Sequence, residues 1–182
     1  MNTNSWKELI KLVMLSLVVV VPFRMFIAQP FVVDGASMDP TFETGDYLIV
    51  DELSYRFQTP ARGSVLIFRY PRDPRKSFIK RVIGLPNETV SIADGKVSII
   101  NAEYPDGLAL DEPYVKLTKR DTVNYVVGPE EYFVMGDNRL ESADSRVWGP
   151  VPEQNVIGRP IIRFFPPAFL PGDSTQRLDV AE

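Results

Sequence analysis

Ser37 and Lys80 are the first candidates for chemistry in this sequence. Ser37 follows Gly35, whose flexible backbone allows a bend that would present the serine hydroxyl and its own N–H to a cleft. Lys80 lies within residues 77–84, which read as a strand that places the lysine between apolar neighbours on one face. Desolvation lowers the pKa of a lysine, so a neutral Lys80 could serve as a general base near neutral pH. Taken alone, Ser37 also fits a polar turn, and Lys80 also fits an edge-strand lysine whose ammonium reaches water.

A third group of polar residues begins at Gly136 and Asp137 and continues with Ser142, Asp144 and Arg146. Alternation along an extended backbone would put the last three side chains on one face. Asp144 and Arg146 could then pair and brace the loop, while Ser142 could orient a lysine amine. The alternative is a surface turn with an ion pair that contributes little to stability.

The composition limits the chemistry further. The chain has 182 residues with no His and no Cys. These absences exclude Ser–His–Asp triads, His-ligated zinc, thiol nucleophiles, disulfides and iron–sulfur clusters. Hydrolysis would therefore have to use Ser, Thr, Lys, Tyr or carboxylates. The formal net charge of -4 argues against nucleic acid as the main partner, and the length suits one domain.

The N-terminal segment predicts a membrane anchor. Residues 9–28 are about twenty in number, enough to cross a bilayer if Lys11 and Arg24 reach its two interfaces. Lys7 and Lys11 precede the apolar run, so the positive-inside rule places the N-terminus in the cytoplasm. We expect a short cytoplasmic tail at 1–11 and a transmembrane anchor at 9–28. A cleaved signal peptide is the alternative, although a small residue is missing at the −3 position.

The following part of the chain, residues 30–170, reads as antiparallel β-structure. Short β-branched or aromatic runs recur every roughly eight to twelve residues without intervening helices, which predicts a sandwich or partly closed barrel. Asp94-Gly95 is a strong hairpin signal. Residues 101–121 read as an insertion or small subdomain, and residues 171–182 as a polar C-terminal tail. The expected strands are 47–51, 64–70, 77–84, 89–93, 96–100, 122–127, 132–136 and 158–165.

Taken together and in this order, these segments resemble the bacterial type I signal peptidases, which are membrane-anchored serine endopeptidases with a Ser–Lys dyad. The resemblance covers about residues 24–166, most of the chain. Glu112-Pro113-Tyr114 and Asn155–Gly158 also fit the family pattern. The main matching segments are Gln29-Pro30-Phe31-Val32-Val33 leading into Ser37-Met38-x-Pro40-Thr41, then Gly45–Val50, Lys80–Pro86, Phe133–Arg139 and Ser142–Val151.

The resemblance implies a role for each matching residue. Ser37 would be the nucleophile and Lys80 the general base. Gly35 stands where some relatives carry a serine that helps the oxyanion hole, so the backbone N–H of Ser37 is the expected donor. Met38 is a candidate for the wall of the substrate pocket. The supporting residues would be Ser142, which orients the lysine, the bracing pair Asp144 and Arg146, and the neighbouring Gly136 and Asp137.

The resemblance also implies a mostly antiparallel β fold and a reaction that needs no metal or cofactor. The expected substrates are secreted preproteins cleaved after small residues at −1 and −3, usually Ala-x-Ala. The expected location is the bacterial cytoplasmic (inner) membrane, with a single N-in span and the catalytic domain on the extracytoplasmic side. Expected partners are preproteins and membrane lipid, with no nucleic acid, and the enzyme is expected to be a monomer.

Two other classes of protein remain as alternatives. The first is a different Ser–Lys processing protease, such as a conjugation-type or mitochondrial inner-membrane peptidase; the self-cleaving SOS repressors carry a DNA-binding domain that is absent here. The second is a non-catalytic, membrane-tethered β-domain that binds exported chains.

Overall fold

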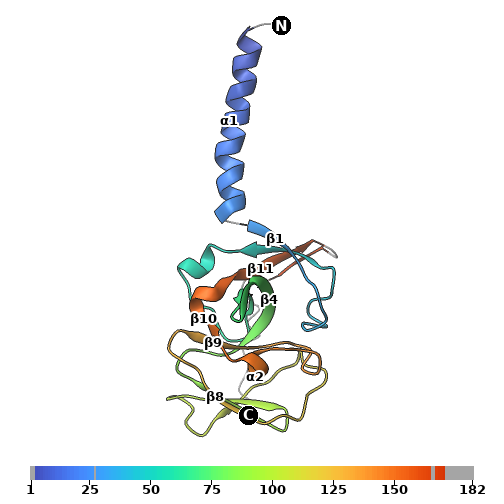
Figure 1. Cartoon of the computed structure of the whole chain (residues 1–182), viewed down its shortest axis with the longest axis vertical. Helices are drawn as coiled ribbons and strands as arrows, with labels where there is room; N and C mark the ends of the chain where they lie inside the picture. The colour runs from blue at the N-terminus through green and yellow to red at the C-terminus, as the bar shows by residue number, and fades with distance from the viewer. Residues whose placement is uncertain (1–2, 27, 165–166, 171–182) are drawn as a thin grey trace.

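A long N-terminal helix leads into a β-rich domain (Figure 1). The computed structural model describes residues 3–26, 28–164 and 167–170. The helix α1 spans Thr3–Phe26 and extends away from the sheets (Figure 1). The predicted polar tail at 171–182 lies outside the described residues.

The membrane anchor expected at 9–28 overlaps α1 over residues 9–26. Among the described residues, no helix combines the length and the apolar character required to cross a bilayer. The helix also ends earlier than expected, at Phe26, because Ala28 already pairs with Asp51 as the first residue of a strand.

The larger sheet has eight strands, and every pair within it is antiparallel. Its strand order is β1-β2-β11-β3-β4-β9-β10, with β12 paired to β11. Three of its pairings, β2 with β11, β11 with β3 and β4 with β9, join strands that are far apart in the sequence, so the sheet brings the N-terminal, middle and C-terminal parts of the domain together. Its strands are β1 (Ala28–Val32), β2 (Tyr47–Asp51), β3 (Val65–Tyr70), β4 (Asp73–Gly84), β9 (Glu131–Met135), β10 (Val151–Pro152), β11 (Val156–Phe164) and β12 (Pro167–Phe169).

The smaller sheet has four strands in the order β7-β6-β5-β8. Its central hairpin turns at Asp94 and Gly95, with φ values of 50° and 79°, as the sequence signal predicted. The segment 101–121 contributes β7 and a loop that returns toward the larger sheet. The strands are β5 (Thr89–Ala93), β6 (Lys96–Ile100), β7 (Leu108–Ala109) and β8 (Val123–Val126).

The fold class is therefore mainly antiparallel β, as predicted, but the described sheets are not closed into a barrel. The strands β1, β7, β10 and β12 were not expected: β7, β10 and β12 have only two or three residues, too few to show a period of two, and β1 continues the apolar run of the N-terminal segment. The turn of helix α2 (Ser145–Trp148) and the 3₁₀ turns η1 (Ser54–Arg56) and η2 (Glu153–Asn155) were also missed.

Three apolar clusters hold the sheets together, and two of them border the functional residues. One contains Val33, Met38, Phe42 and Leu48 under the loop that follows β1. Another packs Phe68, Val82 and Val134 around Trp148. The third lies between the small sheet and strands β4 and β9. The first two clusters fix the loop after β1 and the strand β4 relative to each other.

Candidate active site

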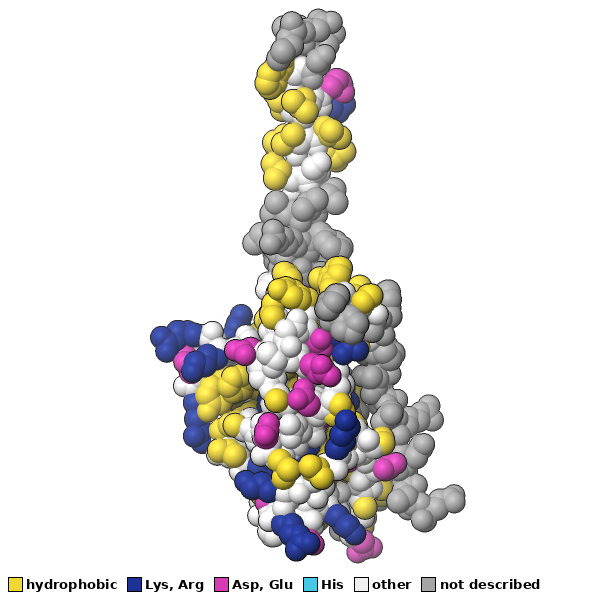
Figure 2. Space-filling view, turned by 90° about the vertical axis from the view of Figure 1, so that its right-hand side faces the viewer, with side chains coloured by type: hydrophobic (Ala, Val, Ile, Leu, Met, Phe, Trp, Pro, Cys, Tyr) yellow, Lys and Arg dark blue, Asp and Glu magenta, His cyan; other side chains and the backbone are white. Residues whose placement is uncertain are grey.

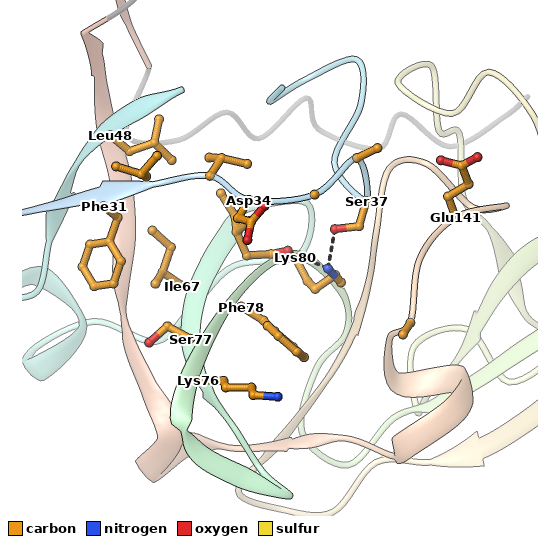
Figure 3. Close-up of a pocket in the computed structure, with 16 residues that line it drawn as sticks. Phe31, Asp34, Ser37, Leu48, Ile67, Lys76, Ser77, Phe78, Lys80 and Glu141 are labelled. Carbon is orange, nitrogen blue, oxygen red and sulfur yellow. Dashed lines mark hydrogen bonds between the residues drawn. The ribbon is translucent and has the colours of Figure 1, made fainter. Parts of the chain in front are cut away.

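Ser37 and Lys80 meet within a groove. Lys80 Nζ lies 2.6 Å from Ser37 Oγ and 3.0 Å from the carbonyl oxygen of Ile79, and donates to both (Figure 3). The lysine is 4% exposed and its ammonium lies 5.6 Å from the centre of the Phe78 ring. The alternation predicted for residues 77–84 thus places Lys80 beside Phe78 on one face of β4.

Burial changes the acid–base behaviour of Lys80. Desolvation lowers its pKa from 10.5 to about 8, and the charges of Asp144 and Asp137 offset part of that effect. A pKa of about 8 leaves an appreciable neutral fraction near pH 7. A neutral amine next to a hydroxyl can accept the hydroxyl proton, so the pair can act as a base and a nucleophile.

The loop that carries Ser37 is held by backbone and side-chain contacts. Gly35 has a φ of 101°, a conformation that favours glycine, and lets the chain turn out of β1. From the other side, the Asn138 N–H donates to the Ser37 carbonyl at 3.2 Å, and its Nδ2 donates to the Ala36 carbonyl at 3.1 Å. Asn138 thus positions the serine, a role that local sequence reasoning did not assign.

Gly136 allows this close approach. A Cβ on Gly136 would lie 2.4 Å from the Ser37 carbonyl oxygen and 2.3 Å from Ser142 Oγ, both well inside van der Waals contact. Its N–H donates to Asp144 Oδ2 at 3.0 Å. The structure therefore places Gly136 where two loops touch, and explains why a side chain does not fit there.

Asp137 pairs with Arg81, the residue next to Lys80 on the opposite face of β4. Arg81 donates Nε to Oδ1 at 2.8 Å and Nη2 to Oδ2 at 2.6 Å, and Nη1 donates to the Gly63 carbonyl at 2.7 Å. Thr41 Oγ1 also donates to Asp137 Oδ2 at 2.5 Å. This two-pronged pair ties the strand of Lys80 to the loop after β9 and to the turn after Ser37. Arg81 was not among the predicted site residues, although strand alternation beside Lys80 would have placed it on the opposite face.

Asp144 and Arg146 form the predicted pair, by a different geometry. Arg146 donates Nε to Asp144 Oδ1 at 2.8 Å and Nη2 to Oδ2 at 2.9 Å, and Nη1 donates to Asp121 at 2.9 Å. Asp144 caps the N-terminus of α2, so the extended backbone expected through residue 146 is wrong. Burial would raise the pKa of Asp144, but its hydrogen bonds and the charge of Arg146 outweigh burial and lower it.

Ser142 is half-buried, with its Oγ packed against Gly136, but it makes no direct bond to the lysine. Its Oγ has no hydrogen-bond partner within the described part of the chain. It lies close enough to the Asp144 carboxylate to help lower that pKa, without the geometry of a hydrogen bond. The structure thus brings Ser142 to the site, while its orienting role toward Lys80 stays a prediction.

The segment 101–121 contacts the site through Glu112 and Tyr114, to which the sequence analysis assigned no role. Arg139 donates Nη1 to Glu112 Oε2 at 2.9 Å and Nη2 to Oε1, and its Nε donates to the Gly136 carbonyl at 3.0 Å. Tyr114 Oη donates to Glu112 at 3.0 Å, and its ring lies 4.0 Å from the Arg81 guanidinium. Burial raises the pKa of Tyr114, so the phenol stays protonated. The loop therefore pairs with Arg139 through Glu112 and covers the Arg81–Asp137 ion pair with the Tyr114 ring.

A groove of about 640 Å³ leads to Ser37. Figure 3 shows Phe31, Leu48 and Ile67 on one side of the dyad and Glu141 on the other. The predicted position of Met38 on the pocket wall is corrected: Met38 is 1% exposed and packs in the core below the loop. Its neighbours Gly35 and Ala36 line the groove instead. Among the described residues, no cluster of three acidic side chains is placed to hold a metal ion.

Comparisons with known proteins find one family. A family model described as "Signal peptidase, peptidase S26" matches residues 6–165. A probable signal peptidase I-1 of Synechocystis is 42% identical over 88% of this chain and 83% of its own length. A signal peptidase I of Leptolyngbya laminosa is 41% identical over 87% of this chain and 79% of its own length. A crystal structure of a signal peptidase I from Enterococcus faecalis is 31% identical, with a TM-score of 0.48 over 56% of this chain and 97% of that chain.

Proposed function

The chain belongs to the peptidase S26 family of signal peptidases, and on that premise we propose that it cleaves signal peptides from exported preproteins with a Ser37–Lys80 dyad. The observation that carries the proposal is the 2.6 Å contact between Lys80 Nζ and Ser37 Oγ within the groove. The two residues come from separate elements, and neither His nor Cys is available to do the same work.

The reaction begins when neutral Lys80 accepts the proton of the Ser37 hydroxyl. Oγ attacks the scissile carbonyl, and the resulting oxyanion accepts a hydrogen bond from the backbone N–H of Ser37. Protonated Lys80 then returns its proton to the leaving amine, which departs as the new N-terminus of the mature protein. An acyl-enzyme remains on Ser37.

Water completes the cycle by the same chemistry. Neutral Lys80 takes a proton from a water molecule, the hydroxide attacks the acyl-enzyme, and Ser37 recovers its proton from the lysine as the signal peptide leaves. The low pKa of Lys80 serves both steps, because the amine must be neutral at the start of each. Asp137 and Asp144 keep that pKa from falling further.

The substrate binds in an extended conformation between two strand-like segments. β4 pairs with β3 from residue 73 onward, whereas its pairing with β9 begins only at Arg81. Residues 76–80 of β4 therefore border the groove, and residues 31–37 line it from the other side. A peptide placed here would add to the edge of a sheet and hydrogen-bond through its backbone.

Exclusion sets the preference for small residues before the cleavage site. Ile79, Ile67 and Val33 line the groove near the dyad and pack in or against an apolar core cluster. Because this packing is dense, displacing them to admit a large side chain would cost free energy. Alanine at −1 and −3 fits such walls, whereas a bulky residue clashes with them.

α1 supports a membrane location for the enzyme. The described side chains of α1 include Leu12, Met14 and Leu15, whose surfaces are 57–62% exposed. Yellow patches lie on the helix and on the end of the domain nearest to it (Figure 2). Val32, Tyr47 and Phe164 of the domain are more than half exposed. Exposed apolar surface on a helix and on the adjoining end of a domain fits contact with lipid. The cleavage site of a preprotein emerges from the same membrane.

Cleavage of a preprotein with an Ala-x-Ala junction tests the function. Detergent-solubilised wild type should cut at the junction, and Ser37→Ala and Lys80→Ala should each lose at least about a thousandfold in rate. Lys96→Ala is the matched control, because Lys96 is an exposed lysine on a strand outside the groove. Full activity in Lys80→Ala would assign the base elsewhere. A folded wild type that binds the preprotein without cutting it would favour a binding module.

A further inference from the structure

Glu141 occupies a distinct position in the groove. Ser37 and Lys80 lie between an apolar part of the groove, lined by Phe31, Leu48 and Ile67, and the side on which Glu141 lies (Figure 3). The apolar part begins at β1, directly after α1, and so faces the end of the domain from which a membrane-embedded signal peptide would arrive. The first residues of the mature protein then leave past Ser37, across the side where Glu141 lies.

The charge of Glu141 is available to a substrate. The two arginines of the same loop, Arg139 and Arg146, are buried and paired with Glu112, Asp144 and Asp121. Glu141 is exposed, and no ion pair involves it among the residues that the structure describes. Its backbone N–H donates to Asn138 Oδ1 at 3.4 Å, and Asn138 also holds the Ser37 loop. The carboxylate is therefore attached to the framework that positions the nucleophile.

We propose that Glu141 is a specificity-determining residue, which favours basic and disfavours acidic side chains among the first residues of the mature chain. The inference rests on the proposed function, because it assigns a direction to the bound preprotein. A carboxylate at this end attracts a Lys or Arg side chain that passes over it and repels Asp or Glu. Lys76 lies in the other part of the groove, so it acts on the signal-peptide side and does not cancel this effect.

The expected effect is modest because Glu141 is exposed to water. Exposed charge pairs change a free energy by a fraction of a kcal/mol, so exchanging Asp for Lys in the substrate should raise kcat/KM by about two- to fivefold. The bias should decrease as salt is added, because the Debye length shortens from about 30 Å at 0.01 M to about 3 Å at 1 M ionic strength. The bias should appear in kcat/KM, with KM carrying most of it.

The experiment uses preproteins that differ in one residue. Substrates with Lys, Gln or Asp at the first, second or third position after an Ala-x-Ala junction are cleaved by wild type, Glu141→Gln and Glu141→Lys in a non-ionic detergent. Wild type should prefer Lys over Asp at one or more of these positions, Glu141→Gln should bring the ratio to about one, and Glu141→Lys should invert it.

Two matched variants isolate the position of the charge. Glu130→Gln removes an exposed carboxylate outside the groove and should leave the ratio unchanged. Asp34→Asn removes the other acidic side chain that lines the groove. If Asp34→Asn abolishes the bias while Glu141→Gln keeps it, or if wild type shows no bias at any position, the assignment of Glu141 is overturned. Cleavage of the Gln substrate by wild type separates these outcomes from a failure of the proposed function, in which no substrate is cut.

Discussion

The pH dependence of cleavage is the most direct consequence of the site. With a pKa of about 8, roughly one Lys80 in eleven is neutral at pH 7, whereas a lysine at the ordinary 10.5 would be neutral about once in three thousand molecules. Burial therefore increases the population of the reactive form about three-hundredfold at pH 7. If the neutral amine is the base, kcat/KM should rise about tenfold per pH unit below pH 7 and level off above pH 9.

The assay follows initial rates of cleavage between pH 5.5 and 10, on two preproteins without titratable residues near the junction. An apparent pKa within about one unit of 8 on both substrates is the expected result. Circular dichroism across the same range controls for acid unfolding, because unfolding would also lower the cleavage rate at low pH. A flat profile between pH 6 and 8, or activity that falls as pH rises through this range, would refute a neutral-lysine base.

Three further predictions concern the stability and packing of the site. The pKa of Lys80 is lower in the folded protein than in the unfolded chain. Protonation of Lys80 therefore reduces the free energy of unfolding, fully below about pH 8 and progressively less as the pH approaches 10.5. Lys80→Met removes this effect and should raise the free energy of unfolding at pH 7 by up to about 3 kcal/mol. Urea titrations at pH 7 and 10 test this, and a Lys80→Met protein less stable than wild type at pH 7 would contradict it. Gly136→Ala should lower kcat by about a hundredfold or more, because the new methyl would displace the Ser37 carbonyl; a loss under fivefold in a burst-corrected assay would be incompatible with that clash. Glu112→Ala should destabilise the domain by about 3 kcal/mol by leaving Arg139 buried and unpaired, and adding Arg139→Met should restore part of the loss in thermal melts; additive losses would argue against the pair.

Several features of the site were accessible from local sequence patterns. The alternation around Lys80 predicted a strand with the lysine between apolar neighbours, and β4 has that arrangement. The pair of Asp144 and Arg146 was expected from two residues of opposite charge at short spacing. The backbone conformation predicted for this pair was wrong, because the alternation of residues 142–146 was interpreted as an extended segment. In the structure the Asp144 side chain accepts a hydrogen bond from the Arg146 N–H and caps the N-terminus of α2.

Other residues could be placed only by long-range contacts. Asn138 lies 102 positions after the Ala36 carbonyl that it binds, and Arg81 lies 56 positions before the Asp137 with which it pairs. Neither residue differs locally from an ordinary polar side chain in a loop or strand. Met38 was misassigned for the same reason, since whether an apolar side chain lines a groove or the core depends on which surfaces pack against it.

The sequence by itself determined which chemistry is absent and where most of the longer strands lie. A chain without His and Cys cannot build an imidazole or thiol site, and period-two runs of β-branched residues favour sheets because their side chains alternate between faces. The tertiary structure alone decided that Ser37 and Lys80, 43 positions apart, lie 2.6 Å from each other and that the lysine is desolvated. Proximity and burial depend on every strand that packs around the pair, so a lysine with an ordinary local sequence acquires a pKa of about 8 only when the whole sheet has formed.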